Sequence, residues 1–237
     1  MKPFLRIIYR LMKMCLRKDG FYSKDISIPY KRLGSEYGGW CIYPDPINEQ
    51  SIVYSFGIGE DFTFDMELIA FSNATVHGFD FTPRSIEYVR SNNRSLKFIF
   101  HPYGLSNEDG VLEVFPPWNL NFVSLARAPQ AKTSRKSIEV PVKTITTIIR
   151  ELNHCEIDIL KMDIEGCEFD VLDDILNLEK KPGQLLIELH HFMKGFSIVD
   201  TKKAVKKIRD AGYLMFAISP QGKEFSFIHK DLLETRN

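Results

Sequence analysis

The 237-residue sequence predicts an α/β fold: a mostly parallel sheet with helices on both faces and an antiparallel hairpin near its C-terminal end. From residue 51 onward, segments rich in β-forming residues alternate with segments of helical periodicity. The first strand ends at a Gly-x-Gly turn, Gly57 to Gly59, which leads into a helix. The last two strands are joined by a turn too short to hold a crossover helix.

The individual elements follow from these patterns. We expect strands at 52–56, 75–80, 96–101, 157–163, 184–189, 213–218 and 224–229. We expect helices at 61–72, 83–93, 144–153, 167–178 and 198–211. Pro83 suits the first position of its helix, with Thr82 as the N-cap. The short turn SPQGKE makes the last two strands a hairpin, so the predicted sheet has seven strands.

We divide the chain into an N-terminal segment, 1–48, and a main domain, 49–237. Residues 1–18 are basic and contain no acidic residue, with apolar side chains at helical spacing. This pattern indicates either a helix attracted to anionic lipid or a helix that packs on the main domain. Residues 19–50 contain a strand-like piece, Ile26 to Tyr30, and the aromatic segment Tyr37 to Pro44. The aromatic segment is either a lid or substrate wall or an irregular packed connector.

An insertion, residues 102–143, separates the third and fourth strands. It contains a strand-like piece at 111–115, followed by a long loop with little periodicity at 116–136. Loops of this length in compact domains are usually functional or mobile. The basic residues of the loop suit an acidic substrate, although a solvated surface loop explains them equally well.

The composition narrows the class of protein. Lysine plus arginine and aspartate plus glutamate both number 31, and this balance argues against a general nucleic-acid binder. The four cysteines are scattered without metal-ligand spacing, which favours reduced thiols and a cytoplasmic location. No stretch approaches the ~20 apolar residues of a membrane span. Membrane contact would therefore be peripheral, through residues 1–18, and the oligomeric state is not predicted.

Ligands of open α/β sheets bind beyond the carboxyl ends of the strands, so the residues at those ends form the candidate cofactor site. Asp80 follows the second strand, 21 residues after Gly59, where a carboxylate can accept hydrogen bonds from both hydroxyls of a ribose. The segment Tyr103 to Asn107 follows the third strand and can wall an adenine ring. The predicted cofactor-binding residues are Ser55, Gly57, Gly59, Glu60, Asp80, Phe81, Gly104, Leu105 and Asp163.

Four polar residues at the ends of the fourth and fifth strands are the catalytic candidates. Asp163 and Glu165 follow the buried-looking run DILKM and reach one site together if the chain turns there. His190 and His191 follow the fifth strand and can act as a base or hold a metal. Neither histidine has a third metal ligand at a regular spacing, so we predict no metal site.

The first loop also indicates which cofactor binds. A dinucleotide-binding loop requires a third glycine three residues after the second, and that position is Phe62, which would hinder close approach of helix and strand. S-adenosyl-L-methionine has no pyrophosphate and does not need this glycine. The segment Asp163 to Gly166 and the terminal hairpin, the expected end of a class I methyltransferase domain, also favour the methyl donor.

The segments VYSFGIGEDFTFD, VHGFDFTP, DILKMDIEGCEFDVL and LLIELHH resemble the corresponding motifs of FkbM-type and related methyltransferase-like proteins, in order over about residues 37–230. The resemblance implies a Rossmann-like class I methyltransferase fold and S-adenosylmethionine-dependent methylation, with oxygen as the expected acceptor atom. By position, Gly57 and Gly59 match the cofactor loop of that family, Asp80 the ribose acid and Asp163 the carboxylate near the methionine moiety. The first loop departs from the family pattern, because it lacks an acid before Gly57 and an asparagine after Gly59.

We therefore expect in-line methyl transfer to a hydroxyl of a sugar, glycan or other small acceptor, with Glu165, His190 or His191 as the general base. Asp163 is expected mainly to position the cofactor. The departures near Gly57 leave open an alternative, a cofactor- or glycan-binding module without catalysis. A nicotinamide oxidoreductase is disfavoured by Phe62, and a nucleic-acid methyltransferase by the neutral charge and by the lack of an Asn-Pro-Pro-aromatic motif after the fourth strand.

Overall fold

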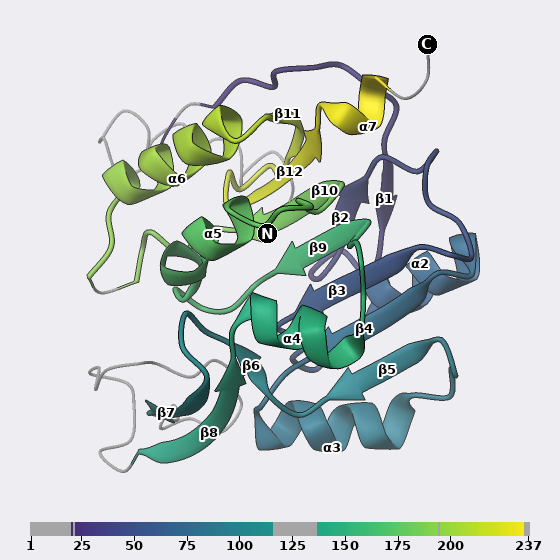
Figure 1. Ribbon diagram of the computed structural model, residues 1–237, viewed down its shortest axis with the longest axis vertical. Coiled ribbons are helices and arrows are strands. Elements are labelled where there is room, and N and C mark those ends of the chain that lie inside the picture. The colour runs from purple at the N-terminus through teal and green to yellow at the C-terminus, as the bar shows by residue number, and fades with distance from the viewer. Residues whose placement is uncertain (1–19, 21, 116–136, 194, 235–237) are drawn as a thin grey trace.

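The main sheet has seven strands in the order β11-β12-β10-β9-β3-β4-β5 (Figure 1). The computed structural model describes residues 20, 22–115, 137–193 and 195–234, so the predictions for residues 1–18 and 116–136 lie outside the described residues. The strands are β3 (Ile52–Phe56), β4 (Thr75–Phe79), β5 (Phe98–His101), β9 (Ile159–Met162), β10 (Gln184–Glu188), β11 (Tyr213–Ile218) and β12 (Glu224–His229). The predicted α/β fold with a seven-stranded sheet is confirmed.

The sheet is parallel except for one strand. β3 pairs in parallel with β4 and β9, β4 with β5, and β9 with β10. β12 runs antiparallel to both β10 and β11, so it lies between them and forms the predicted hairpin with β11. This arrangement brings the carboxyl ends of β3, β4 and β9 to one edge of the sheet, where a ligand site is expected.

Helices cover both faces of the sheet because the strand side chains are buried on both sides. Phe56 and Met162 pack with the helices α4 (Ile145–Leu152), α5 (Glu168–Leu176) and α6 (Ile198–Asp210). Val53 and Val76 pack on the opposite face with α2 (Thr63–Ser72) and α3 (Pro83–Asn92). A short helix, α7 (Asp231–Glu234), follows β12.

The start of α3 agrees with the prediction from the sequence. Thr82 is the N-cap and its hydroxyl accepts a hydrogen bond from the backbone N–H of Ser85, while Pro83 occupies the first turn. Proline is tolerated there because the first N–H groups of a helix have no partner within the helix. The cap fixes the point where the chain leaves β4, and with it the position of Asp80.

The N-terminal segment contains a small hairpin that the sequence patterns did not predict. Its strands are β1 (Lys31–Leu33) and β2 (Trp40–Ile42), which pair antiparallel. The predicted strand at 26–30 is wrong: this stretch is irregular, and its first residue donates a backbone hydrogen bond to the carbonyl of Met215. Strands of three residues carry too little periodicity to be recognised, and Trp40 and Ile42 are held by burial against the main domain.

The insertion between β5 and β9 forms a separate three-stranded sheet, in the order β6-β8-β7. The strands are β6 (Gly104–Leu105), β7 (Gly110–Val114) and β8 (Ile138–Lys143), and they lie at the lower left of Figure 1. β7 matches the strand-like piece predicted at 111–115, whereas β8 was not predicted. Val114, Val140 and Val142 form a small core of their own within this sheet.

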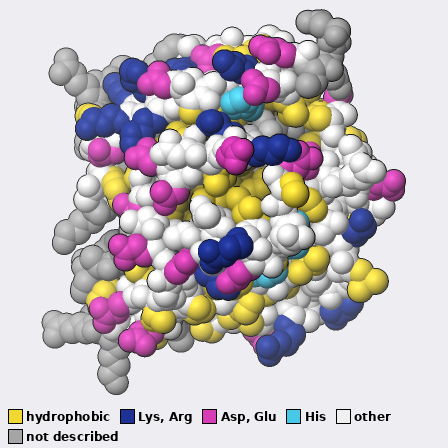
Figure 2. All heavy atoms as spheres, viewed as in Figure 1, with side chains coloured by type: hydrophobic (Ala, Val, Ile, Leu, Met, Phe, Trp, Pro, Cys, Tyr) yellow, Lys and Arg dark blue, Asp and Glu magenta, His cyan; other side chains and the backbone are white. Residues whose placement is uncertain are grey.

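Charged side chains of both signs are interspersed over the face shown in Figure 2, with apolar side chains exposed between them. This distribution agrees with the zero formal net charge of the chain. No helix within the described ranges has both the length and the apolar character needed to cross a membrane.

Three histidines gather between β4, β5 and the end of α4. His77 and His101 share a hydrogen bond of 3.0 Å between Nδ1 and Nε2, and the Tyr54 hydroxyl bonds Nδ1 of His154 at 2.8 Å. In the bond between His77 and His101 one ring nitrogen donates and the other accepts. The accepting nitrogen carries no proton, so at least one of these two rings is neutral. Burial, together with neighbouring positive charge, lowers the pKa of both His77 and His101 to about 4.

This cluster predicts a loss of stability in acid. An unfolded histidine titrates near pH ~6.5, so between about pH 6.5 and pH 4 the unfolded chain binds more protons than the folded one. We expect His101→Gln to reduce the loss of unfolding free energy between pH 7 and pH 5 by about 1 kcal/mol relative to the wild type. Urea denaturation at both pH values measures this difference. Equal losses of unfolding free energy in the two proteins would mean that protonation of His101 does not cause the loss of stability in acid.

Candidate active site

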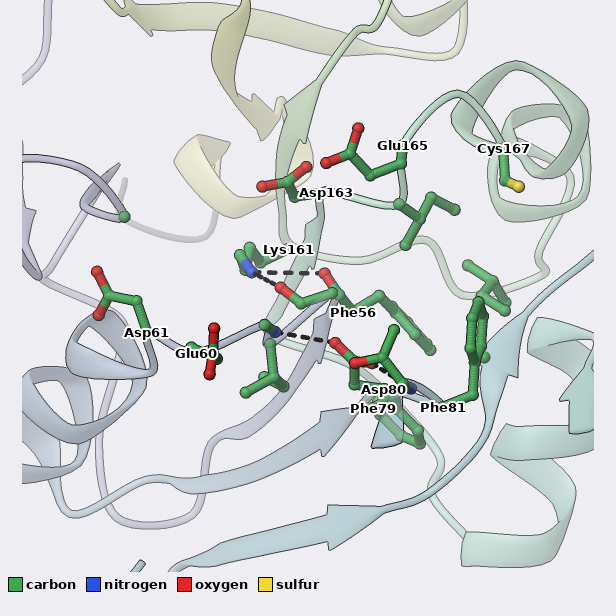
Figure 3. Close-up of a pocket in the computed structure, with 18 of the residues that line it drawn as sticks. Phe56, Glu60, Asp61, Phe79, Asp80, Phe81, Lys161, Asp163, Glu165 and Cys167 are labelled. Atoms are coloured by element: carbon green, nitrogen blue, oxygen red, sulfur yellow. Dashed lines mark hydrogen bonds between the residues drawn. The ribbon is translucent and has the colours of Figure 1, made fainter. Parts of the chain in front are cut away.

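A cavity of about 620 Å³ lies at the carboxyl ends of β3, β4 and β9 (Figure 3). This volume is within the range of about 300–1,000 Å³ that is typical of small-molecule sites. Its walls come from the loop after β3, the ends of β4 and β9, the small sheet of the insertion, and the N-terminal segment with Tyr37 and Trp40. The aromatic segment Tyr37 to Pro44 thus contributes to the wall of the cavity, one of the two interpretations left open by the sequence.

The loop after β3 brings the backbone to the edge of the cavity. Gly57 and Gly59 both have positive φ, at 77° and 57°. The Gly57 N–H donates to the carbonyl of Phe79, which ties the loop to β4. A Cβ on Gly57 would stand 1.7 Å from the carbonyl oxygen of Asp163, whereas a Cβ on Gly59 would meet no atom within 4 Å. Gly57 therefore permits close packing of β3 on β9, and Gly59 borders open space.

Asp80 lies in the cavity opposite the acidic residues that follow β9, and it binds the loop after β3. Its Oδ2 accepts a hydrogen bond from the Gly59 N–H at 2.9 Å, and its Oδ1 accepts one from the Thr82 N–H at 2.7 Å. These two bonds orient the carboxylate and leave each oxygen with capacity for a further donor. The ring of Phe81 packs beside Gly104, which with Leu105 continues the wall.

Lys161 is a cavity residue that the sequence reasoning missed. It lies on β9 with 6% of its surface exposed. Its Nζ donates to the carbonyl oxygens of Gly57, at 2.7 Å, and Phe56, at 3.4 Å (Figure 3). Burial raises the pKa of the nearby Asp65 to about 6, and the charge of Lys161 opposes that rise. The available signal in the sequence was a charged lysine between the apolar residues of the buried-looking run DILKM.

Asp163 and Glu165 both line the cavity because β9 ends at Met162 and the chain turns directly afterwards. Glu165 has a φ of 55°, which is uncommon for a residue other than glycine, and Gly166 follows with a φ of 97°. Figure 3 shows the two carboxylates close together at this turn, on the side of the cavity. Backbone strain of this kind is concentrated at functional sites.

His190 lies behind these carboxylates and is 3% exposed. Its Nδ1 bonds Oε1 of Glu168 at 2.7 Å, and Glu168 is fully buried and also accepts from the backbone N–H groups of Ile164 and Gly166. Burial opposes a charge on the ring, but Glu168 and the other nearby acids together raise the pKa of His190 to about 10. Burial and the charge of Asp163 raise the pKa of Glu188 to about 8.

The structure places the predicted residues in two groups. The cavity is lined by Gly57, Gly59, Glu60, Asp80, Phe81, Gly104, Leu105, Asp163 and Glu165. Ser55 is fully buried within β3 and is not among the residues that line the cavity, so its cofactor role stays a prediction from the sequence. His190 contacts the cavity acids from behind, and His191 does not line the cavity. Glu60 pairs with Arg84 at the rim, at 2.5 Å.

The sheet order and the position of the cavity define a Rossmann-like class I methyltransferase fold. The family model of the methyltransferase FkbM domain matches residues 38–215, so the chain belongs to that family. Family membership identifies S-adenosyl-L-methionine as the cofactor. The residues present fit it: the open backbone at Gly59 and the oriented carboxylate of Asp80 lie together in a cavity of suitable size.

Among curated proteins, the chain is 26% identical over 160 residues to the "Probable methyltransferase-like protein 24" of Homo sapiens. The match covers 67% of this chain but only 37% of that relative. Among solved structures, it is similar to the fibrillarin pre-rRNA processing protein of Methanococcus jannaschii, at 12% identity and a TM-score of 0.48, over 79% of this chain and 69% of that one. Aeropyrum pernix fibrillarin with bound S-adenosyl-L-methionine matches at 11% identity and a TM-score of 0.40, over 77% and 66% of the two chains.

Proposed function

We propose that the chain is an S-adenosyl-L-methionine-dependent methyltransferase that methylates a hydroxyl of a sugar, a glycan or another small acceptor. The observation that carries this proposal is the convergence of three features in one cavity: the Gly57–Gly59 loop, the oriented carboxylate of Asp80 and the paired carboxylates of Asp163 and Glu165. The first two suit the nucleoside part of the cofactor. The third supplies acceptors for the hydroxyl that is to be methylated.

The cofactor would be held by residues that follow β3, β4 and β9 of the main sheet, next to β6 of the insertion. Asp80 would accept hydrogen bonds from the ribose hydroxyls, while the backbone at Gly59 permits close approach and Phe81, Gly104 and Leu105 form an adjoining wall. Asp163 would face the methionine part. When bound, S-adenosyl-L-methionine supplies an electrophilic methyl group on a positively charged sulfur.

Glu165 is our preferred group for orienting the acceptor hydroxyl and accepting its proton. Its side chain is 39% exposed at the cavity, whereas His190 is shielded behind it and His191 lies outside the lining. Holding the nucleophile in line with the methyl group is expected to supply most of the acceleration. A sugar suits this wall because the exposed Tyr37 offers an aromatic face for its apolar ring atoms, near carboxylates for its hydroxyls.

Substitution of Asp80 tests the cofactor site. Loss of hydrogen bonds to a charged group costs about 1.5–3 kcal/mol, which corresponds to a ~10–100-fold weaker affinity. We expect Asp80→Ala to weaken S-adenosyl-L-methionine binding by that factor, measured by calorimetry. Asp173→Asn is a matched control, because Asp173 pairs with Lys207 on the helical surface. Unchanged affinity in Asp80→Ala would exclude the proposed site.

Methyl transfer itself separates the enzyme from a binding module without catalysis. Incubation with radiolabelled donor and pools of sugars, glycans, lipids and peptides is expected to label the sugar or glycan fraction, and Glu165→Gln to reduce that labelling. Binding of the donor without transfer to any pool would favour the non-catalytic module. A cytoplasmic location, and peripheral membrane contact through residues 1–18, remain predictions from the sequence.

A further inference from the structure

We propose that Asp163, Glu165 and His190 form a binding site for a divalent metal cation at the edge of the cavity. One ligand atom from each of these residues lies within 4.8 Å of the other two. The ligands come from the end of β9, the turn after it and the end of β10, which explains why their spacing in the sequence did not indicate a metal.

The distances around His190 carry the argument. Nε2 lies 3.6 Å from Oδ1 of Asp163, 3.6 Å from Oε2 of Glu165 and 3.6 Å from Oε1 of Glu188. This separation is too long for a hydrogen bond. Atoms that share one metal ion through bonds of about 2.0–2.2 Å stand roughly 3.3–3.6 Å apart in a tetrahedral site. The three carboxylates therefore surround Nε2 at the separation expected of fellow ligands.

Glu168 provides an independent second observation. It is fully buried, it is fixed by two backbone N–H donors, and its Oε1 bonds Nδ1 of His190 at 2.7 Å. Histidines that bind metals commonly donate their other ring N–H to a carboxylate, which fixes the tautomer and the ring orientation. Here that carboxylate holds the Nδ1 proton and directs Nε2 of a buried ring toward Asp163 and Glu165. A cation bound at Nε2 takes the place of the proton on that nitrogen, which is released to solvent.

Glu188 is less suited to be a ligand, because Lys223 lies 3.8 Å from its Oε1. We assign it to the surroundings of the site, where its charge adds to the attraction for a cation. Asp163 and Glu165 are about one-third exposed on the cavity side, so an ion can enter from the cavity and keep positions open for further oxygen ligands. One imidazole and two carboxylates offer both nitrogen and oxygen to a divalent first-row cation, and Mn²⁺ serves as the probe because it is paramagnetic.

The use of this cation rests on the function proposed above, whereas its binding does not. Beside the carboxylate that we assign to the acceptor hydroxyl, a divalent cation would bind that hydroxyl oxygen and make its proton easier to remove. The inferred class of acceptor then narrows to molecules that offer a hydroxyl with a neighbouring oxygen able to share the ion.

Binding of Mn²⁺ tests the site without any assay of activity. The full chain, stripped of metal by a chelator, is titrated with Mn²⁺ while the electron paramagnetic resonance signal of the free ion is followed. We expect saturation at one ion per chain, and at least 10-fold weaker binding in Glu165→Gln and in Asp163→Asn. Glu168→Gln alters no ligand but changes the group that orients His190 and holds the turn at Ile164 and Gly166, and it is expected to weaken binding by ~10–100-fold. Thermal melting of each variant verifies that it is folded.

Asp173→Asn is the matched control and is expected to bind Mn²⁺ like the wild type, because this carboxylate pairs with Lys207 away from the cavity. Failure of the wild type to bind Mn²⁺ saturably, or equal binding by the wild type and Glu165→Gln, would overturn the inference. Calorimetry with S-adenosyl-L-methionine on the same samples keeps the two proposals apart. If the wild type binds S-adenosyl-L-methionine but not Mn²⁺, only the metal site is rejected. If the wild type does not bind S-adenosyl-L-methionine, the proposed function is rejected.

Discussion

Replacement of Gly57 by alanine is expected to be among the most damaging single substitutions in the chain. The new Cβ would lie 1.7 Å from the carbonyl oxygen of Asp163, and a side chain would also have to adopt a φ of +77°. The left-handed conformation costs about 1–2 kcal/mol, and overpacking against a backbone that cannot move costs about 1–3 kcal/mol or more. We expect a loss of roughly 3–5 kcal/mol in unfolding free energy, measured by urea denaturation, and loss of donor binding because Asp163 is displaced.

Gly59→Ala is the matched control for this experiment. Gly59 also has positive φ, but no atom lies within 4 Å of the position that a Cβ would take there. Its substitution should therefore cost only the conformational term of about 1–2 kcal/mol. Equal destabilisation by the two substitutions would mean that contact between the glycine loop and β9 is not what holds this edge of the sheet together.

Replacement of Lys161 by methionine is expected to have the second large effect. Methionine keeps most of the volume of the side chain but removes the donor to the Gly57 carbonyl and the positive charge near buried Asp65. Leaving a buried charge without compensation costs about 3–5 kcal/mol, and part of this is relieved when Asp65 takes up a proton. We expect a loss of about 2–4 kcal/mol, which for a chain of this size lowers the melting temperature by ~5–15 °C.

Two further variants make the Lys161 experiment specific. Lys180→Met removes a lysine whose ion pair with Glu156 is about two-thirds exposed, and it should change stability by less than about 0.5 kcal/mol. Adding Asp65→Asn to Lys161→Met removes the uncompensated charge and should recover part of the loss. If the double variant were no more stable than Lys161→Met, the charge of Asp65 would not explain the effect.

Most of the main sheet could be predicted from the sequence because its strands are buried on both faces and its helices have one apolar side. Ile52–Phe56 and the hairpin of β11 and β12 match the predicted bounds. β1, β2 and β6 could not be predicted, because strands of two or three residues have no measurable periodicity. Their positions are set by contacts with distant parts of the chain, such as the backbone of Tyr43 with the side chain of Gln184.

The candidate site was predictable where a residue directly follows a strand, as Asp80 and Asp163 do. That Ser55 lies outside the cavity lining could not be predicted, because alternation along a strand does not reveal which residues meet the cavity when both faces of β3 are covered. Lys161 was missed for the same reason: its side chain runs along the edge of the sheet to reach the Gly57 carbonyl. The grouping of His190 with Asp163 and Glu165 requires the parallel pairing of β9 with β10, which no local pattern contains.

The small sheet of the insertion forms one wall of the cavity and is separate from the main sheet, which forms the side with the glycine loop and Asp80. Within the parts of the chain that are described, β6, β7 and β8 hydrogen-bond as strands to one another and not to the seven-stranded sheet. Leu112 and Val114 of β7 line the cavity, whereas Gly57 and Asp80 belong to the main sheet. Sequence changes at Leu112 and Val114 can therefore reshape what the cavity admits while the register of the main sheet stays intact. In a fold with two separate sheets around one cavity, substitutions in the smaller sheet can change which ligands bind without altering the larger one.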